Sequence, residues 1–254
     1  MNSKWKLIAM LSILMLVLAG CGGEQEAISE DSEGIWNRFF VYPFSWLLIT
    51  IAQFFNGDYG LSIIVVTIII RIVLLPLFIK QQNSAVAMKR LQPRMKELQE
   101  KYSSKNQAEA QKLQQEMMKL YRDEGVNPMM GCLPILLQMP ILMAFYFAIQ
   151  RTEELAAHSF LWVDLGEPDP FFIFPILAGL MMFLQTKITA KDMPENMRPI
   201  MMLMPVMMIV AGIFLPSALS LYWATGGVFM IFQTLVFTKR KEKLEQSQQE
   251  KTTT

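Results

Sequence analysis

Five apolar runs divide this chain, and each approaches the roughly 20 residues that a helix needs to cross the hydrocarbon core of a bilayer. They lie at about 61–79, 132–149, 171–186, 200–215 and 218–237. Of the 254 residues, 53% are hydrophobic and only 18% are charged, a composition typical of integral membrane proteins. The sequence therefore predicts an all-α, polytopic membrane protein with five transmembrane helices.

The charge of the loops between these runs predicts the orientation of the chain. Residues 80–127 hold ten Lys or Arg against six Asp or Glu, whereas residues 151–170 hold one basic residue against five acidic ones. Basic loops stay in the cytoplasm. We therefore expect 80–127, the short loop 187–198 and the basic tail 239–254 inside, with 151–170 outside.

The N-terminus carries the features of an export signal. Lys4 and Lys6 precede an apolar stretch that ends in "LAGC", with Cys21 as its last residue. This order resembles a bacterial lipoprotein signal, which implies a signal peptide over 1–20, cleavage before Cys21 and attachment of lipid, palmitate included, to that cysteine. The acidic residues 21–35 would then form a flexible tether outside the cell. An ordinary signal peptide or a first spanning helix is the alternative.

The next segment, 36–58, is rich in aromatic residues and contains Arg38 and Pro43. Aromatic rings favour the headgroup zone of a membrane. We predict an amphipathic helix lying on the outer interface. A full spanning helix is the alternative, and it would invert the topology of everything that follows.

The first cytoplasmic loop is dense in strong helix formers and is broken at "YSSKN", so it predicts a helical hairpin over 81–126 in which Ser103 or Ser104 caps the second helix. Its apolar side chains recur at helical spacing. They could pack only on each other or form a docking surface. These side chains are Met88, Leu91, Met95 and Leu98 in the first arm and Leu113, Met117 and Leu120 in the second.

Arg71 lies within the first apolar run, in "TIIIRIVLLP", about 15 Å from its start at a rise of roughly 1.5 Å per residue. A charge at that depth is costly unless it faces water or an internal partner. None of the five runs contains Asp or Glu, so a buried ion pair is disfavoured. The pattern favours a wet, positive cavity lined also by neutral polar residues from other runs. The candidates are Gln138, Gln185, Thr225 and Gln233, any of which could instead tie helices together.

No motif points to covalent chemistry. Cys21 and Cys132 are too few for a disulfide framework or a zinc site, and the lone His158 has no second ligand nearby. We expect no metal, no cofactor and no enzymatic activity.

The stretch "NPMMGCLPILLQMPILMAFYFAI", residues 127–149, together with an arginine in the first run and a basic hairpin between them, resembles the YidC family of membrane protein insertases. The resemblance covers about 36–240, with a core at 59–238 and a lipoprotein start typical of Gram-positive members. It implies that the chain inserts new membrane proteins, with nascent membrane proteins and membrane lipid as partners. Ribosome and Sec translocon are further possible partners.

Carried over by position, Arg71 matches the family's groove arginine, which attracts acidic segments of the substrate. Gln185 and Trp223 fall where the family has groove-lining residues, and Gln138 and Gln233 complete the predicted groove. The methionine-rich stretch 201–210 could form an adaptable apolar slide or simply pack against lipid. The tail could touch ribosomal RNA through phosphates, without reading a specific nucleic acid sequence, or act as a topology anchor.

Two rival classes remain from the residues alone. In a secondary transporter or channel, Arg71 would bind a small anion, but the odd number of runs and the hairpin argue against that class. A lipid-anchored scaffold would leave Arg71 unexplained.

Overall fold

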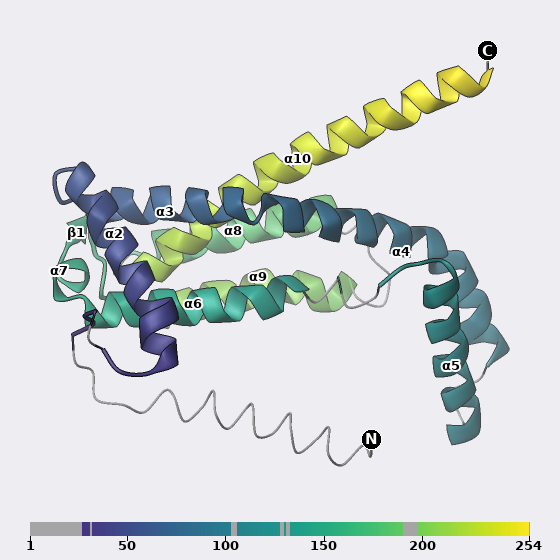
Figure 1. The fold of residues 1–254 in the computed structure, drawn as a ribbon, viewed down its shortest axis with the longest axis horizontal. Coiled ribbons are helices and arrows are strands. Elements are labelled where there is room, and N and C mark those ends of the chain that lie inside the picture. Colours follow the sequence, from purple (N-terminus) through teal and green to yellow (C-terminus); the bar gives the residue numbers. More distant parts are fainter. Residues whose placement is uncertain are drawn as a thin grey trace.

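The computed structural model describes residues 27–30, 32–102, 106–127, 130, 133–189 and 198–253. In this part the protein is mostly helical, as predicted (Figure 1). A single antiparallel hairpin pairs β1 (Ser159–Phe160) with β2 (Val163–Asp164). The helices are η1 (Asn37–Val41, a π-helix), α2 (Tyr42–Phe54), α3 (Tyr59–Val73), α4 (Leu75–Lys101), α5 (Gln107–Asp123), α6 (Leu133–Arg151), α7 (Glu153–Ala156), α8 (Ile173–Thr189), α9 (Arg198–Phe214) and α10 (Ser217–Thr253).

The apolar helices differ in length. Within the described residues, the segment Ser217–Phe237 of α10, 21 residues long, is long and apolar enough to cross a membrane. Helices α3 and α4 meet the same requirement only when taken together as a bent pair. Helix α8 and the Met201–Phe214 part of α9 are apolar but shorter. A count of five spans therefore stays a prediction.

The first apolar run is not one straight helix, in contrast to the prediction of a span over 61–79. It breaks at Leu74, and α3 and α4 meet there at a bend of 56°. Pro76 is the second residue of α4 and has no N–H to donate to the carbonyl of Ile72. The carbonyl of Ile72 accepts from the N–H of Leu74 instead, and this N–H also bonds to the carbonyl of Ile70, four residues earlier. The last residues of the run, from Leu75 on, belong to the first arm of the hairpin.

Two other boundaries also differ from the predicted ones, at the end of α10 and at the start of α5. Helix α10 does not end with its apolar segment but continues through the basic tail to Thr253. Helix α5 begins at Gln107 with Asn106 as N-cap, whereas the sequence predicted Ser103 or Ser104 as its cap. Those two serines themselves lie outside the described residues. The predicted interfacial segment 36–58 forms η1 and α2 in direct succession, and Pro43 is the second residue of α2.

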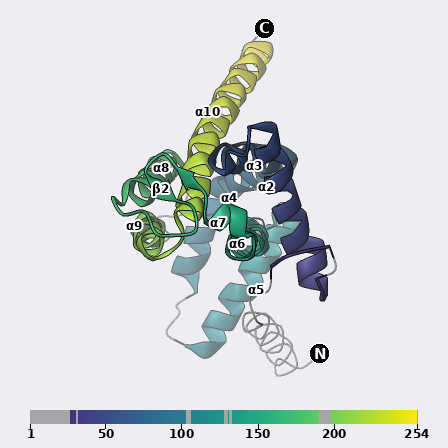
Figure 2. The same ribbon diagram turned by 90° about the vertical axis from the view of Figure 1, so that its left-hand side faces the viewer.

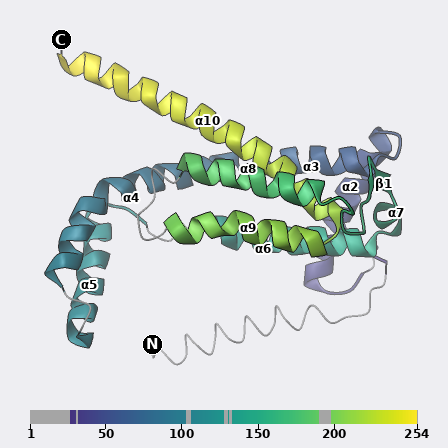
Figure 3. The same ribbon diagram turned by 180° about the vertical axis from the view of Figure 1, so that it is seen from behind.

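Helix α10 is the centre of the arrangement. It contacts α3, α6, α8 and α9, while α2 packs on α3 and α6. Seen along the helices, the α8 and α9 pair lies on one side of α10 and the α2 and α3 pair on the other (Figure 2). The α4 and α5 hairpin lies at the opposite end of the bundle from the β-hairpin and α7 (Figures 1 and 3).

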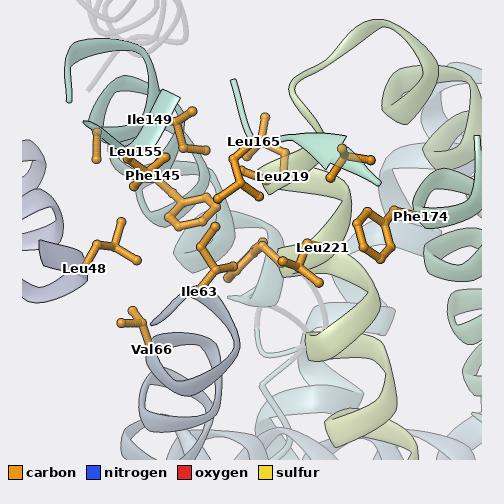
Figure 4. Packing of buried hydrophobic residues seen from close by; sticks show 14 of the residues in the cluster. Leu48, Ile63, Val66, Phe145, Ile149, Leu155, Leu165, Phe174, Leu219 and Leu221 are labelled. Atoms are coloured by element: carbon orange, nitrogen blue, oxygen red, sulfur yellow. The ribbon is translucent and has the colours of Figure 1, made fainter. Parts of the chain in front are cut away.

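The buried core lies at the end of the bundle that carries α7 and the β-hairpin (Figure 4). Its side chains come from α2, α3, α6, α7, α8 and α10 and from the loop between α7 and α8. They include Leu48, Ile63, Val66, Phe145, Ile149, Leu155, Leu165, Phe174, Leu219 and Leu221.

Hydrogen bonds join the start of α10 to this end of the molecule. The N–H of Ser217 donates to Glu167 O at 2.7 Å, and its hydroxyl donates to Asp164 O at 2.8 Å. Ala218 N donates to Leu165 O at 3.1 Å. The first N–H groups of a helix have no partner within the helix, so the loop supplies these partners and fixes where α10 begins.

Candidate functional site

Arg71 occupies the last turn of α3, where this helix packs against α10. It lies twelve residues after Tyr59, which is about 18 Å along a helix with a rise of roughly 1.5 Å per residue. The side chain is partly exposed. The break at Leu74 ends α3 just after Arg71, so the arginine lies within one turn of a bend and not in the middle of a straight span.

The guanidinium group lies directly against the backbone of α10 at Gly226. A Cβ placed on Gly226 would lie 2.6 Å from Nη2 of Arg71, 3.2 Å from Nε and 3.3 Å from Cζ. These distances are shorter than ordinary carbon to nitrogen contacts, which begin near 3.5 Å. The arginine therefore occupies the space that a side chain at position 226 would need.

One hydrogen-bond donor of Arg71 has no partner among the described residues. Its Nε is buried and, in the part of the chain that the structure describes, makes no hydrogen bond. The apolar helices around it, α3, α6, α8, α9 and α10 up to Phe237, contain no Asp or Glu. A buried donor without a partner costs free energy, and a charged donor costs more. The site is thus poised for an anionic or strongly polar partner from outside the chain.

Gln138 also meets α10, one turn from Gly226. Its Nε2 donates a hydrogen bond of 2.8 Å to the hydroxyl of Tyr222. Tyr222 is buried, and its ring lies 5.0 Å from that of Phe145. Since Tyr222 and Gly226 are four residues apart, they share one face of α10. The structure therefore brings Arg71 and Gln138 to adjacent turns of the same helix face.

The remaining predicted residues are placed around the same helix without direct bonds to Arg71 among the described residues. Gln233 is nearly buried on α10, and its spacing of seven from Gly226 puts it on the same face two turns away. Trp223 is partly buried against the core. Gln185 lies one turn after Met181, the α8 residue that packs against Gly227 of α10. Thr225 is partly exposed on α10.

Sequence reasoning did not single out Tyr222 or Gly226. A phenol within an apolar helix needs a hydrogen-bond partner, and a small residue in such a helix often marks a close helix contact. These two signals, in "LYWATGG", could have identified both residues.

Two other predicted features lie away from this site. Cys21 and the signal peptide 1–20 fall outside the described residues, as does Cys132. Nε2 of His158 lies 3.8 Å from Oδ1 of Asp58, which caps α3 by accepting a bond from Leu61 N. No cluster of metal-ligating side chains occurs among the residues that the structure describes.

Comparison with known proteins identifies a family. The family model described as "60Kd inner membrane protein" matches residues 50–245. A protein of Alkalihalophilus pseudofirmus named "Membrane protein insertase YidC" is 54% identical over 245 residues, which cover 94% of this chain and 97% of that protein. "Membrane protein insertase MisCA" of Bacillus subtilis is 52% identical over 233 residues, covering 91% of this chain and 89% of MisCA.

A solved structure has a similar fold. It is described as "Active YidC insertase crystal structure with the first transmembrane domain resolved", and it matches with a TM-score of 0.60 at 27% sequence identity. The match covers 80% of this chain but only 46% of that longer protein.

Proposed function

We propose that this chain receives acidic segments of its substrates at Arg71. The chain belongs to the YidC family of membrane protein insertases, the family described as 60Kd inner membrane protein. Relatives at about 50% identity over most of the chain are named insertases, so the chain is a membrane protein insertase. Its substrates are nascent membrane proteins. Insertion moves a segment without making or breaking a covalent bond.

The unpaired charge of Arg71 is the observation that carries the proposed mechanism. A guanidinium without a carboxylate partner, with Nε buried and unbonded in the described structure, attracts a carboxylate that approaches from the cytoplasm. The attraction is stronger in a site of low dielectric constant than in water. It would hold an acidic segment while the neighbouring hydrophobic segment partitions into lipid, and that partition supplies most of the free energy.

The polar residues around α10 would form the rest of a hydrophilic groove. Gln138, Gln185, Trp223 and Gln233 would line the path that the substrate segment follows. The amides of the three glutamines would replace part of its hydration shell. Helix α9 offers exposed apolar side chains for the hydrophobic segment of the client. These are Met202, Leu203, Met204, Val206, Met207 and Val210.

The proposed topology follows from the loop charges. Five spans correspond to α3 with the start of α4, α6, α8, α9 and α10 up to Phe237, with η1 and α2 on the outer interface. The α4 and α5 hairpin and the end of α10 lie in the cytoplasm. The N-terminus lies outside, anchored by lipid on Cys21. The hairpin and the basic end of α10 are the surfaces available to a ribosome or to the Sec translocon.

The test is insertion of a single-spanning client with an acidic N-terminal tail into vesicles that contain the purified protein. We expect Arg71→Ala to slow insertion by roughly tenfold or more, a barrier change of about 1.4 kcal/mol. Arg71→Lys should retain much of the activity, because a lysine keeps the positive charge. The matched control is the same client with Asn and Gln in place of its tail acids, whose insertion should not depend on Arg71.

Normal insertion of the acidic client by Arg71→Ala would disprove the electrostatic mechanism. Deletion of the α4 and α5 hairpin separates insertion from carriage of a small anion, the other function that a positive site could serve. A carrier would tolerate deletion of the hairpin better than an insertase, and the named relatives give it no support.

A further inference from the structure

Gly226 stands out among the glycines of the described chain because of what surrounds it. The three heavy atoms nearest to its missing Cβ all belong to Arg71, at 2.6, 3.2 and 3.3 Å. The corresponding neighbours of Gly179, Gly212 and Gly227 are residues of packed helices, such as Ile209, Pro175 and Met181. The other described glycines show no contact with Arg71 either. Gly226 thus makes room for one side chain, that of the arginine.

Neither the backbone nor the helix itself calls for glycine at this position. Gly226 lies inside α10 without the positive φ that favours glycine elsewhere in the chain, as at Gly57 and Gly125. In the interior of a helix, glycine is less favourable than alanine by roughly 1 kcal/mol. A residue that weakens the helix and serves no turn needs another reason, and the guanidinium supplies one.

We propose that Gly226 is a positioning residue for Arg71: its missing side chain leaves the space in which the guanidinium lies against α10, with Nη2 nearest to Gly226, so that the terminal amino groups, and not Nε, receive the incoming substrate. This inference rests on the proposed role of Arg71. With Nε buried and unbonded in the described structure, Nη1 and Nη2 are the donors left for a carboxylate. The substrate acid would therefore bind at these terminal amino groups.

A methyl group at position 226 would displace this arrangement without breaking the fold. To restore ordinary contact, the guanidinium must move on the order of 1 Å away from α10. The end of an arginine side chain is flexible enough to make that movement, and alanine favours the helix. Gly226→Ala should therefore fold normally and present Arg71 in the wrong place.

Gly227→Ala is the matched control, since it adds the same methyl group one residue further along α10. Its Cβ would lie 2.7 Å from Cβ of Met181, which belongs to the stem of a side chain on α8 and cannot swing away. This variant should disturb the packing of α8 on α10 and lower the melting temperature. It should leave the guanidinium of Arg71 where it is.

The first experiment is a double-mutant cycle in the vesicle assay with the acidic client. We expect Gly226→Ala to slow insertion by about fivefold in the wild-type background and by less than about twofold when Arg71 is already alanine, because the two residues act through one interaction. Insertion of the client without tail acids should not change. Two results would overturn the proposal while leaving the role of Arg71 intact. One is that Gly226→Ala slows insertion equally in both backgrounds. The other is that Gly226→Ala inserts the client at the wild-type rate while Arg71→Ala is defective.

The second experiment reads the position of the guanidinium without any client. Phenylglyoxal modifies arginine, and mass spectrometry of the peptide that contains Arg71 gives the rate of modification. Exposed Arg94 serves as the internal reference. We expect the ratio of the two rates to rise at least about threefold in Gly226→Ala, because the reagent attacks the terminal nitrogens and the added methyl group pushes Nη2, the atom nearest to Gly226, away from α10. The ratio should stay unchanged in Gly227→Ala. An unchanged ratio in Gly226→Ala would disprove the positioning role even if Arg71 proved dispensable for insertion.

Discussion

Asp169 shows how a single carboxylate orders the loop that precedes α8. The residue is fully buried, and all three of its hydrogen bonds come from donors nearby in sequence. Oδ1 accepts from Trp162 Nε1 at 3.1 Å and from Phe171 N at 3.0 Å, while Oδ2 accepts from Phe174 N at 2.8 Å. Phe174 N is one of the first N–H groups of α8, which have no helical partner. Phe171 lies in the loop two residues before the helix.

We predict that Asp169→Ala lowers the free energy of unfolding by about 3 kcal/mol, because it strands three donors in a buried region. Asp169→Asn should cost less, since its amide oxygen still accepts while its NH₂ group faces a donor. Thermal unfolding in detergent measures both effects. Asp164→Asn is the control: that carboxylate is exposed and accepts only from Ser159 Oγ among the bonds described, so a comparable loss there would contradict the argument.

The sequence could identify Arg71 as a functional residue but could not predict its contact with Gly226. The cost of a charge in an apolar run identified Arg71 as functional, and the absence of acids predicted an unpaired guanidinium. The residue that receives it lies 155 positions further along the chain. Nothing local relates the two, because the contact exists only once α3 has packed against α10.

At the scale of elements, apolar composition was a good guide to α6, α8 and α9. Their ends lie within three residues of the ends of the predicted runs, because the hydropathy of the sequence changes sharply there. The break at Leu74 was missed because the residues on both sides of it are equally apolar. A proline near the end of a run can kink a helix or begin a new one, and only the position of α4 decides which.

The tail of α10 was missed for a related reason. Residues 239–253 are polar all round, and such a segment has no apolar face that would predict a helix. It is nevertheless helical because it continues directly from a formed helix, which removes the cost of nucleation.

Pro76 should maintain the bend between α3 and α4, and we predict that Pro76→Ala straightens it. Alanine restores an N–H that can bond to the carbonyl of Ile72, so the two helices gain a continuous hydrogen-bonded turn. Spin labels at Leu61 and Ala85, in a protein without its two cysteines, should then lie several ångströms further apart by electron paramagnetic resonance. Pro93→Ala, within α4, is the control and should leave this distance unchanged.

Straightening should also slow insertion of the acidic client, because Arg71 lies one turn before the bend and the hairpin directly follows it. A straight Pro76→Ala variant that inserts the client at the wild-type rate would show that the bend shapes the hairpin alone.

At the scale of the whole molecule, the bundle has two sides of unequal length. Within the described residues, helices α8 and α9 each have 17 residues, or about 25 Å at 1.5 Å per residue. The apolar part of α10 has 21 residues, or about 32 Å, close to the roughly 30 Å of a bilayer core. The short pair lies side by side on one face (Figure 3), and its outward side chains include Ile176, Leu180, Phe183, Leu203, Val206 and Met207.

A pair of short helices beside a full-length one should thin the bilayer on that face, since lipid adjusts to a short apolar surface at a cost of a fraction of a kcal/mol per ångström. A thinner core lowers the barrier that a polar segment of the client must cross. The apolar face of α8 and α9 would then assist insertion together with the charge of Arg71, each acting on a different part of the client.

We predict that insertion, expressed relative to protein-free vesicles, falls as the acyl chains of the lipid are lengthened from 14 to 22 carbons, by roughly threefold or more. The lipid headgroups stay fixed throughout, so that the charge of the surface does not change. Arg71→Ala should show the same dependence at a lower rate, because thinning and charge act separately. An unchanged or rising ratio in the longer lipids would mean that α8 and α9 tilt or shift to match the bilayer, and that the barrier is lowered at the site of Arg71 alone.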